Sequence, residues 1–600
     1  MCGIYAIIDS TGRADPSNLA SMLVNSRYRG PDAKGTSEHW VGPARILLGV
    51  NRLRIRDVTS RADQPFISTC GQYLLLYNGE IYNEGELRSK LSSHGQQFNS
   101  GSDTEVVLYW LIKKGQAGLA DLQGMFAFIF IDLTRNKLIV ARDRSGIKPL
   151  FYHHRNGLNI FASQPDDIIA SGLVEKKIND QAVKDYLRLK YACPPATFYS
   201  GVMELAPGNI LSLNLTDQQV ETTTIKLEQA TSSSSLNEAL SLAVGAMINP
   251  DKKAGIMLSG GIDSSLLLAV GHEEFGMKGI QTYTLLSDQD DSKFSEANLS
   301  RKIAKRYEAE HHELIVGPPV LERLEEYAIG LDQPVADGGG FTTWLLCEFA
   351  SSNVNTLLSG AGADEYFAGY NRHWAYYVFL KWMRNPQLQF LLKSLGMLPS
   401  IRRFRLVNKY LSSLDPDPYK AFNNFLKLDI RPNNLAIKTY DKFINSIDEW
   451  FSWALKHDQI NYLVSDVLAI TDRASMRHSV EVRLPYLFDP VLDYAKDICS
   501  IDMIRQGRKH LLKEALLHFG GNDIIHAPKR GFGLPLSNWL RLKKSKYLWN
   551  FMNSNALIFN FVEKTIVKQL LDLHCNKRID RSQEILAILI LQFWLDKHFM

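Results

Sequence analysis

The chain has 600 residues, 45% of them hydrophobic and 22% charged, and its formal net charge is only +4. This length exceeds what one hydrophobic core needs, so we expect about two large domains. The small net charge gives no electrostatic case for a nucleic acid or a membrane as the main partner.

The cysteines and the ends of the chain indicate a cytoplasmic protein. The six cysteines form no CxxC pair and no metal-ligand spacing, which is typical of reduced thiols. No basic segment followed by an apolar one opens the sequence, so no secretory signal is predicted. The longest apolar stretch, Ile585 to Leu595, is too short to span a bilayer and predicts a buried C-terminal helix.

The second residue is a candidate nucleophile. If Met1 is removed, as a small second residue permits, Cys2 carries a thiol and a free α-amine on one residue. The α-amine has a pKa of roughly 7.7–8.0 and can act as the base for its own side chain. Such a pair can cleave an amide, although a cysteine at position 2 is by itself a weak signal.

Residues 1–212 contain short apolar runs separated by turn residues. These runs predict strands of packed, largely antiparallel sheets. The clearest of them are Ala44–Val50, Tyr73–Tyr77, Phe126–Ile131 and Lys137–Ala141. Residues 213–235 are polar and end in four serines, so we predict a linker there.

Residues 236–600 show a different pattern, in which apolar runs alternate with helical segments. This alternation is typical of an α/β domain with a parallel sheet and crossover helices. The predicted strands are Ala254–Leu258, Ile280–Leu286, His311–Val316 and Val354–Leu358, with a helix over Ala297–Tyr307. From about Phe367 onward the sequence is mainly helical.

A glycine- and serine-rich loop lies where the first of these strands meets a helix, from Leu258 to Ser265. Its two glycines allow close backbone approach, and hydroxyls with backbone N–H groups at a helix N-terminus form an anion site. No lysine follows the glycines, so this is not a Walker A loop. The Ser-Gly-Gly-x-Asp-Ser order resembles the PP-loop of ATP pyrophosphatases, and Asp263 suits Mg²⁺ or pyrophosphate.

A second loop, Ser359 to Glu365, follows the strand at Val354–Leu358. The carboxyl ends of parallel strands meet at one sheet edge, so Asp364 could supply a second carboxylate to the same metal. The segment could equally be an ordinary helix start.

Further motifs extend the resemblance along nearly the whole chain. The N-terminal part contains Arg29-Gly-Pro-Asp32, Asn78-Gly-Glu-Ile-Tyr-Asn83 and Gly101-Ser-Asp103, and the C-terminal part contains Asp472-Arg-Ala-Ser-Met476 and Ser479-Val-Glu-Val-Arg-Leu-Pro485. With Cys2 and the two glycine loops, these motifs resemble the glutamine-hydrolysing asparagine synthetase family. That family joins a class II glutamine amidotransferase domain of the N-terminal-nucleophile fold to a PP-loop synthetase domain.

The resemblance implies a glutaminase site in the first domain. Cys2 matches the nucleophile, and Asn78 and Gly79 match the oxyanion hole. Arg52 matches the arginine that binds the α-carboxylate of glutamine. Glu80 and Asp103 match the carboxylates that hold its α-ammonium group.

The resemblance also implies an ATP site in the second domain, with Mg²⁺ held by Asp263 and Asp364. The residues that match the ATP and pyrophosphate site are Leu258, Ser259, Gly260, Gly261, Asp263, Ser264, Ser265, Leu285, Ser359, Gly360 and Asp364. Lys529 matches a lysine that stabilises phosphate charge as an acyl-adenylate forms and reacts.

The implied reaction hydrolyses glutamine to ammonia, adenylates aspartate with ATP and forms asparagine, AMP and pyrophosphate, and the family implies a homodimer. Three positions depart from the family pattern: Ala361 stands where an acid is usual, Gln164 replaces a glutamate, and Phe488 is an extra residue. Because a methyl group can neither accept a proton nor bind an ammonium group, either Glu365 takes over the missing task or the acceptor differs. Amidation of another carboxylate, such as a sugar acid or a natural-product intermediate, and a degenerate regulatory role therefore remain alternatives.

Overall fold

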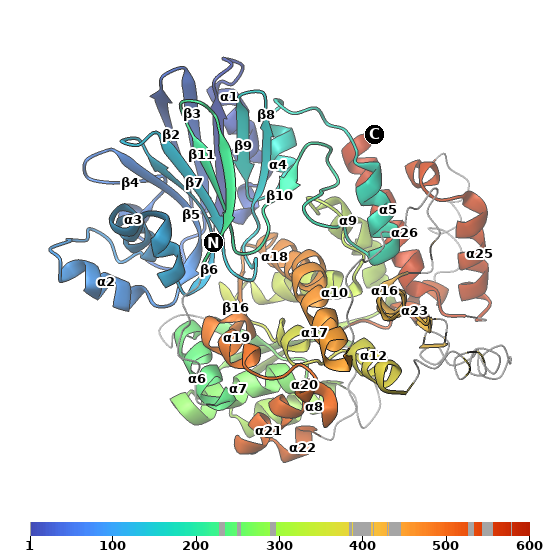
Figure 1. The fold of residues 1–600 in the computed structure, drawn as a ribbon. Helices are drawn as coiled ribbons and strands as arrows, with labels where there is room; N and C mark the ends of the chain where they lie inside the picture. The colour runs from blue at the N-terminus through green and yellow to red at the C-terminus, as the bar shows by residue number, and fades with distance from the viewer. Residues whose placement is uncertain are drawn as a thin grey trace.

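The computed structural model describes residues 2–226, 235–248, 254–288, 296–382, 387, 390, 410–411, 413–428, 430, 446–525, 533–542, 556–577 and 579–600. Within these ranges the chain forms two layered domains that pack against each other (Figure 1).

The N-terminal domain consists of two six-stranded antiparallel sheets packed face to face. The first sheet has the order β10 (Met203–Glu204), β8 (Phe151–Arg155), β9 (Leu158–Ala162), β1 (Cys2–Asp9), β3 (Ala44–Arg52) and β2 (Ala33–Val41). The second has the order β12 (Val220–Thr224), β11 (Asn209–Asn214), β7 (Lys137–Arg142), β6 (Gly124–Asp132), β5 (Tyr73–Ile81) and β4 (Phe66–Ile67). This confirms the predicted α+β domain of packed antiparallel sheets.

Alternation of side chains along these strands builds the core of the domain. Ile4, Ile46 and Leu76 are fully buried between the two sheets, because alternate residues of each strand point to the same face. Helices α1 (Pro16–Asn25) and α4 (Pro165–Ala170) cover the outer face of the first sheet, and α2 (Glu84–Ser92) and α3 (Asp103–Lys114) cover that of the second. All four strands named from the sequence are present.

The second sheet reaches into the segment for which a linker was predicted. β12 pairs with β11 from Leu213↔Val220 to Asn209↔Thr224, so these residues belong to the sheet. Residues 227–234 of the predicted linker lie outside the described residues, and α6 begins at Leu236.

The second domain has a five-stranded parallel sheet of the order β15 (Glu310–Val316), β14 (Gln281–Ser287), β13 (Ala254–Met257), β16 (Thr356–Leu358) and β17 (Glu481–Arg483). The four predicted strands are confirmed, and β17 is an additional strand that the sequence did not predict. Around the sheet lie α6 (Leu236–Met247), α7 (Ile262–Phe275), α8 (Glu296–Arg306) and α10 (Gly338–Ala350).

The remainder of the second domain is helical, as predicted. Its elements are α9 (Leu324–Ile329), α11 (Ala363–Tyr366), α12 (Asn371–Trp382), α16 (Pro418–Leu426), α17 (Ile447–His457), the π-helix η5 (Asp458–Leu468), α18 (Ala469–Met476), α19 (Asp489–Lys496), α20 (Asp502–Arg505), α21 (His510–His518), α22 (Asn522–Ile525), α23 (Leu536–Leu542), α25 (Lys564–Cys575) and α26 (Ser582–Phe599). Helix α26 is buried, and Tyr186 of α5 (Asp180–Leu189) donates a hydrogen bond to its Ala587 carbonyl. Among the described residues, no helix combines the length and apolarity that a membrane crossing requires.

Motifs from the two halves of the sequence meet at the domain interface. The guanidinium of Arg29 forms two hydrogen bonds, of 2.7 and 3.2 Å, to the carboxylate of Asp472, and both residues are buried. The start of β1 lies on the side of the first domain that faces the second (Figure 1). This position places Cys2 close to the interface.

Candidate functional site

Cys2 is the first residue of β1 and is 5% exposed. Its backbone nitrogen donates a 2.9 Å hydrogen bond to Oδ1 of Asn78 on β5, which lies in the opposite sheet. Burial raises the pKa of the Cys2 thiol, and the nearby Arg52 guanidinium acts in the other direction. The thiol therefore needs a base at neutral pH.

Asn78 and Gly79 lie beside Cys2, as the resemblance implies. Asn78 is fully buried, and its Nδ2 has no hydrogen-bond partner within the described part of the chain. An unsatisfied buried donor costs about 1–3 kcal/mol, so this group is suited to an oxygen of a ligand. A Cβ atom at Gly79 would lie 2.2 Å from the Met125 carbonyl oxygen on β6, so no side chain fits there.

Gln64 is a pocket residue that the sequence analysis missed. Its Nε2 lies 3.9 Å from the Cys2 sulfur and donates a 3.0 Å hydrogen bond to the Tyr77 carbonyl. Its Oε1 accepts a 2.6 Å hydrogen bond from the Tyr77 N–H. The two bonds fix the amide group over the thiol, and no local motif distinguishes this glutamine in the sequence.

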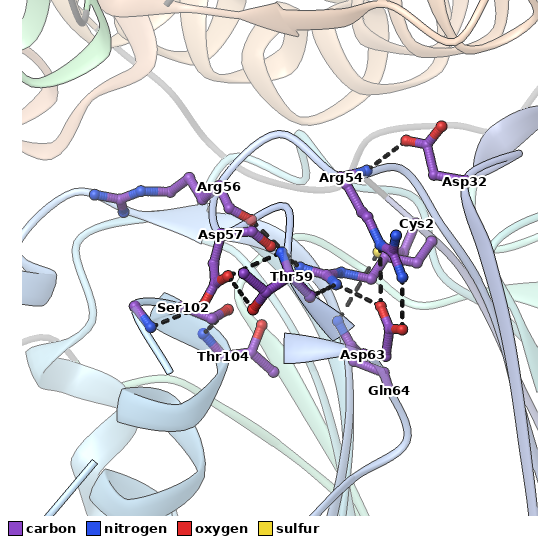
Figure 2. Close-up of polar contacts among 12 residues, drawn as sticks. Cys2, Asp32, Arg54, Arg56, Asp57, Thr59, Asp63, Gln64, Ser102 and Thr104 are labelled. Atoms are coloured by element: carbon purple, nitrogen blue, oxygen red, sulfur yellow. Dashed lines mark hydrogen bonds and ion pairs between the residues drawn. The ribbon is translucent and has the colours of Figure 1, made fainter. Parts of the chain in front are cut away.

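Arg52 directs its guanidinium into the loop that follows β3. Its Nη atoms donate to the carbonyls of Thr59 and Asp57, at 3.1 and 2.7 Å, and to the Asp63 carboxylate at 2.5 Å. Arg52 also lines the pocket that contains Cys2. Figure 2 shows Arg56 extending away from Cys2 and Asp63, and its guanidinium lies 3.6 Å from Glu80.

Glu80 and Asp103 form an acidic wall of the same pocket. Asp103 accepts hydrogen bonds from the Tyr77 hydroxyl and the Ile81 N–H, at 3.1 and 3.0 Å. Burial raises the pKa of Asp103. Burial also raises the pKa of Glu80 to about 7, although Arg483 opposes this shift.

The second domain completes this pocket through β17. Arg483 contacts Glu80 at 2.5 Å and Glu481 at 2.8 Å, and all three side chains are nearly inaccessible to solvent. Burial would raise the pKa of Glu481, but the charge of Arg483 outweighs it and lowers that pKa. In the sequence this segment is recognisable only as a family motif, and the fold is what brings Glu481 and Arg483 into the pocket.

The PP-loop connects β13 to α7. Ser259 and Ser264 bond to each other through their hydroxyls at 3.2 Å, and the Ser265 hydroxyl donates a 2.7 Å hydrogen bond to the Gly261 carbonyl. Gly260 has φ = +71°, a left-handed conformation that favours glycine. The loop therefore presents hydroxyl and N–H groups at the N-terminus of α7.

The Ser359–Glu365 loop approaches the PP-loop closely. A Cβ atom at Gly360 would lie 2.8 Å from the Cβ of Asp263, so only glycine permits this approach. Asp263 and Asp364 both contact Nζ of Lys509, at 2.5 and 2.7 Å. The two predicted carboxylates are thus brought together, as expected from their positions after neighbouring parallel strands.

Lys509 is a second residue that the sequence analysis missed. Burial disfavours its charge, but the carboxylates of Asp263 and Asp364 outweigh burial and raise the pKa of Lys509. Lys509 is the N-cap of α21, where the helix dipole disfavours a positive charge. Its φ of +54° is a left-handed conformation that residues with a side chain rarely adopt. No motif and no predicted helix boundary marks this lysine in the sequence, so its role becomes apparent only in the fold.

One large cleft contains this cluster, and its volume, including the part open to solvent, is about 1880 Å³. Of the predicted ATP-site residues, those that line it are Ser259, Gly260, Gly261, Asp263, Ser264, Ser359, Gly360 and Asp364. Leu258, Ser265 and Leu285 are buried and are not among the lining residues. Lys529 lies outside the described residues.

The donor set suits Mg²⁺ only in combination with substrate oxygens. No group of three or more His, Cys, Asp or Glu side chains arranged to hold a metal occurs among the described residues. Mg²⁺ commonly binds one or two carboxylates together with substrate phosphates, and Asp263 and Asp364 provide two carboxylates at one place. In the structure Lys509 pairs with both carboxylates, and its single positive charge offsets one of their two negative charges.

Comparison with known protein families gives one match in each of the two domains. A family model described as "Glutamine amidotransferase domain" matches residues 1–224, and one described as "Asparagine synthase" matches residues 235–596.

Several named proteins match over most of their length. An asparagine synthetase [glutamine-hydrolyzing] 1 of Bacillus subtilis is 27% identical, covering 100% of this chain and 98% of that protein. A putative asparagine synthetase [glutamine-hydrolyzing] of Mycobacterium bovis is 27% identical, covering 99% of this chain and 97% of that protein. Amidase chry2 of Gibberella zeae is 24% identical, covering 90% of each chain.

Proposed function

Because this chain belongs to the asparagine synthase family and carries an N-terminal glutamine amidotransferase domain, we propose that it transfers ammonia from glutamine to an acceptor carboxylate activated by ATP, with aspartate as the acceptor. The proposal combines two half-reactions, one in each domain. The observation that carries it is the connection between their sites through one strand, β17. There, the Arg483 side chain contacts Glu80 in the first pocket, and the Arg483 carbonyl accepts a 3.0 Å hydrogen bond from the N–H of Ser359, which lines the second.

In the first half-reaction, Cys2 attacks the side-chain amide carbon of glutamine. Once Met1 is removed, the α-amine of Cys2 takes the thiol proton; a base is required because burial raises the pKa of the thiol and keeps it protonated. The unpartnered Nδ2 of Asn78 donates to the oxygen of the tetrahedral intermediate. Ammonia leaves, and water hydrolyses the thioester to glutamate.

In this proposal glutamine is held through the two charged groups on its α-carbon. Glu80 and Asp103 bind the α-ammonium group, and both line the Cys2 pocket. The arginine that binds the α-carboxylate is Arg52 by resemblance. The four hydrogen bonds of its Nη atoms to the loop hold that guanidinium in one place at the pocket wall.

In the second half-reaction, a carboxylate oxygen of the acceptor attacks the α-phosphorus of ATP and pyrophosphate leaves. The PP-loop donors and Lys509 stabilise negative charge on the phosphates. Asp263 and Asp364 would hold Mg²⁺, which would neutralise pyrophosphate when bound. Ammonia then attacks the acyl-adenylate and AMP leaves. By resemblance, Lys529 stabilises the negative charge on the phosphate in this step.

Ala361 favours a second candidate, amidation of a different carboxylate. Its side chain lines the cleft next to Gly360, where a methyl group leaves more room than an acidic side chain. A natural-product intermediate or a sugar acid could use that space. A degenerate regulatory protein is disfavoured because Cys2, Asn78, Asp263 and Asp364 are all arranged for chemistry.

The test is pyrophosphate release with ATP, glutamine and a panel of carboxylates. Release that depends on aspartate, with asparagine as product, supports asparagine synthesis. Release with another acceptor supports the second candidate. Glutamine hydrolysis without pyrophosphate release under any acceptor would contradict a ligase function.

A further inference from the structure

The side chain of Gln64 is held in one orientation at the edge of the Cys2 pocket. β4 pairs with β5 at Phe66↔Leu75, so the same register sets position 64 opposite Tyr77. There Oε1 of Gln64 accepts a 2.6 Å hydrogen bond from the Tyr77 N–H, and Nε2 donates a 3.0 Å hydrogen bond to the Tyr77 carbonyl. Because an N–H needs an acceptor and a carbonyl needs a donor, these two bonds fix which end of the amide faces Cys2.

The second N–H of this amide is directed at the sulfur of Cys2. A primary amide nitrogen carries two hydrogens, and the Tyr77 carbonyl accepts one of them. Nε2 of Gln64 lies 3.9 Å from Sγ of Cys2 (Figure 2), and Gln64 is 5% exposed and lines the pocket. A neutral thiol is a weak acceptor, and hydrogen bonds of catalytic groups are often long before the substrate binds. The contact therefore has room to shorten when charge develops on the sulfur.

The surroundings of Cys2 do little to stabilise a thiolate. Burial raises the pKa of the Cys2 thiol, and the charge of Asp103 raises it further, whereas Arg52 acts in the other direction. Arg52 is itself paired with Asp63. The charged residues that line the described pocket are three of each sign: Arg52, Arg56, Arg483, Glu80, Asp103 and Glu481. With no excess of positive charge, a thiolate there depends on neutral hydrogen-bond donors.

We propose that Gln64 is a catalytic residue of glutamine hydrolysis, whose second N–H binds the sulfur of Cys2 as the thiolate forms. This inference rests on the proposed glutaminase half-reaction. The thiol proton goes to the α-amine, an electron pair of sulfur forms the C–S bond, and the carbonyl electron pair moves to the oxygen that Asn78 binds. Gln64 keeps both of its own hydrogens, so it stabilises charge and orients the sulfur without transferring a proton. A thiolate accepts a hydrogen bond better than a thiol does, so the N–H favours the ionised form.

A purely structural role is the alternative, because the same amide holds the Tyr77 peptide beside Asn78. The two roles predict opposite orders for a pair of substitutions. Gln64→Glu keeps an acceptor for the Tyr77 N–H, whereas Gln64→Met has a similar volume and loses both bonds, so a structural role makes Gln64→Met the more harmful change. At the sulfur both variants lack the N–H donor, and Gln64→Glu, when ionised, adds a negative charge. A catalytic role therefore makes Gln64→Glu the more harmful change for the thiolate.

The experiment measures the ionisation of the Cys2 thiol directly. Mass spectrometry of the peptide that contains Cys2 follows its alkylation by iodoacetamide over a range of pH, separately from the other cysteines. We expect the midpoint of Cys2 alkylation to move to higher pH by about one unit in Gln64→Met and by more in Gln64→Glu, because a lost hydrogen bond to a charged group changes the ionisation equilibrium by about tenfold or more. The kcat of glutamine hydrolysis should fall by about 10- to 100-fold, with a smaller change in KM.

Gln116→Met is the matched control. Gln116 is a half-buried glutamine of the same domain whose Nε2 donates a 2.9 Å hydrogen bond to the Thr223 hydroxyl, and it lies outside the Cys2 pocket. We expect its midpoint and its kcat to equal those of the wild type, and urea unfolding measures the stability of every variant. If Gln64→Met fails to fold, Gln64→Asn decides, because its amide is one methylene shorter and withdraws the N–H from the sulfur without adding charge.

Two results would overturn the proposal. One is a midpoint of Cys2 alkylation in Gln64→Met and Gln64→Asn that equals that of the wild type. The other is a loss of stability that is larger in Gln64→Met than in Gln64→Glu, with only the KM for glutamine changed, which would assign Gln64 a structural role. The proposed glutaminase function fails separately, if the wild-type protein hydrolyses no glutamine, and the alkylation of Cys2 still reports on its thiol in that case.

Discussion

Arg483 links the two domains at the glutamine pocket, and its removal should affect both stability and glutamine binding. In Arg483→Met, the carboxylates of Glu80 and Glu481 lose their common partner while they remain 7% and 2% exposed. Breaking a buried ion pair by removing one member costs about 3–5 kcal/mol of unfolding free energy. Because Glu80 and Glu481 share the same arginine, we expect a loss within or above this range.

The same substitution should raise the KM for glutamine. Without Arg483, the pKa of Glu80, already raised to about 7 by burial, rises further, so Glu80 is protonated at neutral pH. A neutral Glu80 cannot make a charge-assisted contact of about 1.5–3 kcal/mol with the α-ammonium group. The KM should therefore rise by about 10- to 100-fold, with a smaller change in kcat.

Arg301→Met is the matched control for Arg483→Met. Arg301 likewise pairs with an acidic side chain, donating two hydrogen bonds to Glu313, but its own side chain is 52% exposed. Such a surface pair contributes about 0–1 kcal/mol. Urea unfolding measures the stability of both variants, and glutaminase kinetics measure their KM for glutamine. The reasoning is refuted if Arg483→Met is as stable as Arg301→Met and binds glutamine like the wild type.

Four other predictions follow from the two sites. Cys2→Ala should abolish glutamine hydrolysis while free ammonium still supports amide formation, and retained hydrolysis in the purified variant would exclude Cys2 as the nucleophile. Asp263→Asn and Asp364→Asn should each remove pyrophosphate release and leave glutamine hydrolysis intact; loss of both activities would indicate misfolding instead. Since Glu80 must be ionised to bind an ammonium group and its pKa is about 7, the KM for glutamine should rise as the pH falls below 7, and a KM that stays constant between pH 8 and pH 6 would exclude this role. Ala361→Glu should alter acceptor use if position 361 sets specificity; a wild-type protein that converts aspartate efficiently and is unaffected by the substitution would contradict that idea.

The strands of both domains could be predicted because a buried strand has a recognisably apolar sequence. β6 and β13 consist largely of apolar residues, and both lie in buried sheets. β17 escaped prediction because its Glu481 and Arg483 look like surface residues. Their burial depends on the pairing of Arg483 with both Glu481 and Glu80, which no local pattern reveals.

The residues of the candidate sites also fall into those that a local motif identifies and those that only the fold brings to the site. Cys2, Asn78, Asp263 and Asp364 lie in short motifs whose chemistry can be recognised locally. Gln64 and Lys509 reach their places through the fold, since Lys509 is separated from Asp263 by 246 positions.

The central claim is that one chain moves nitrogen from glutamine to an ATP-activated acceptor. The direct measurement follows the label from [amide-¹⁵N]glutamine while AMP and pyrophosphate are quantified in the same reaction. The account predicts ¹⁵N in the amide of the product, with one pyrophosphate released for each amide formed, and no label transfer by Cys2→Ala. Labelled ammonia released in full to solvent, with no ¹⁵N amide formed from any acceptor that supports pyrophosphate release, would contradict it.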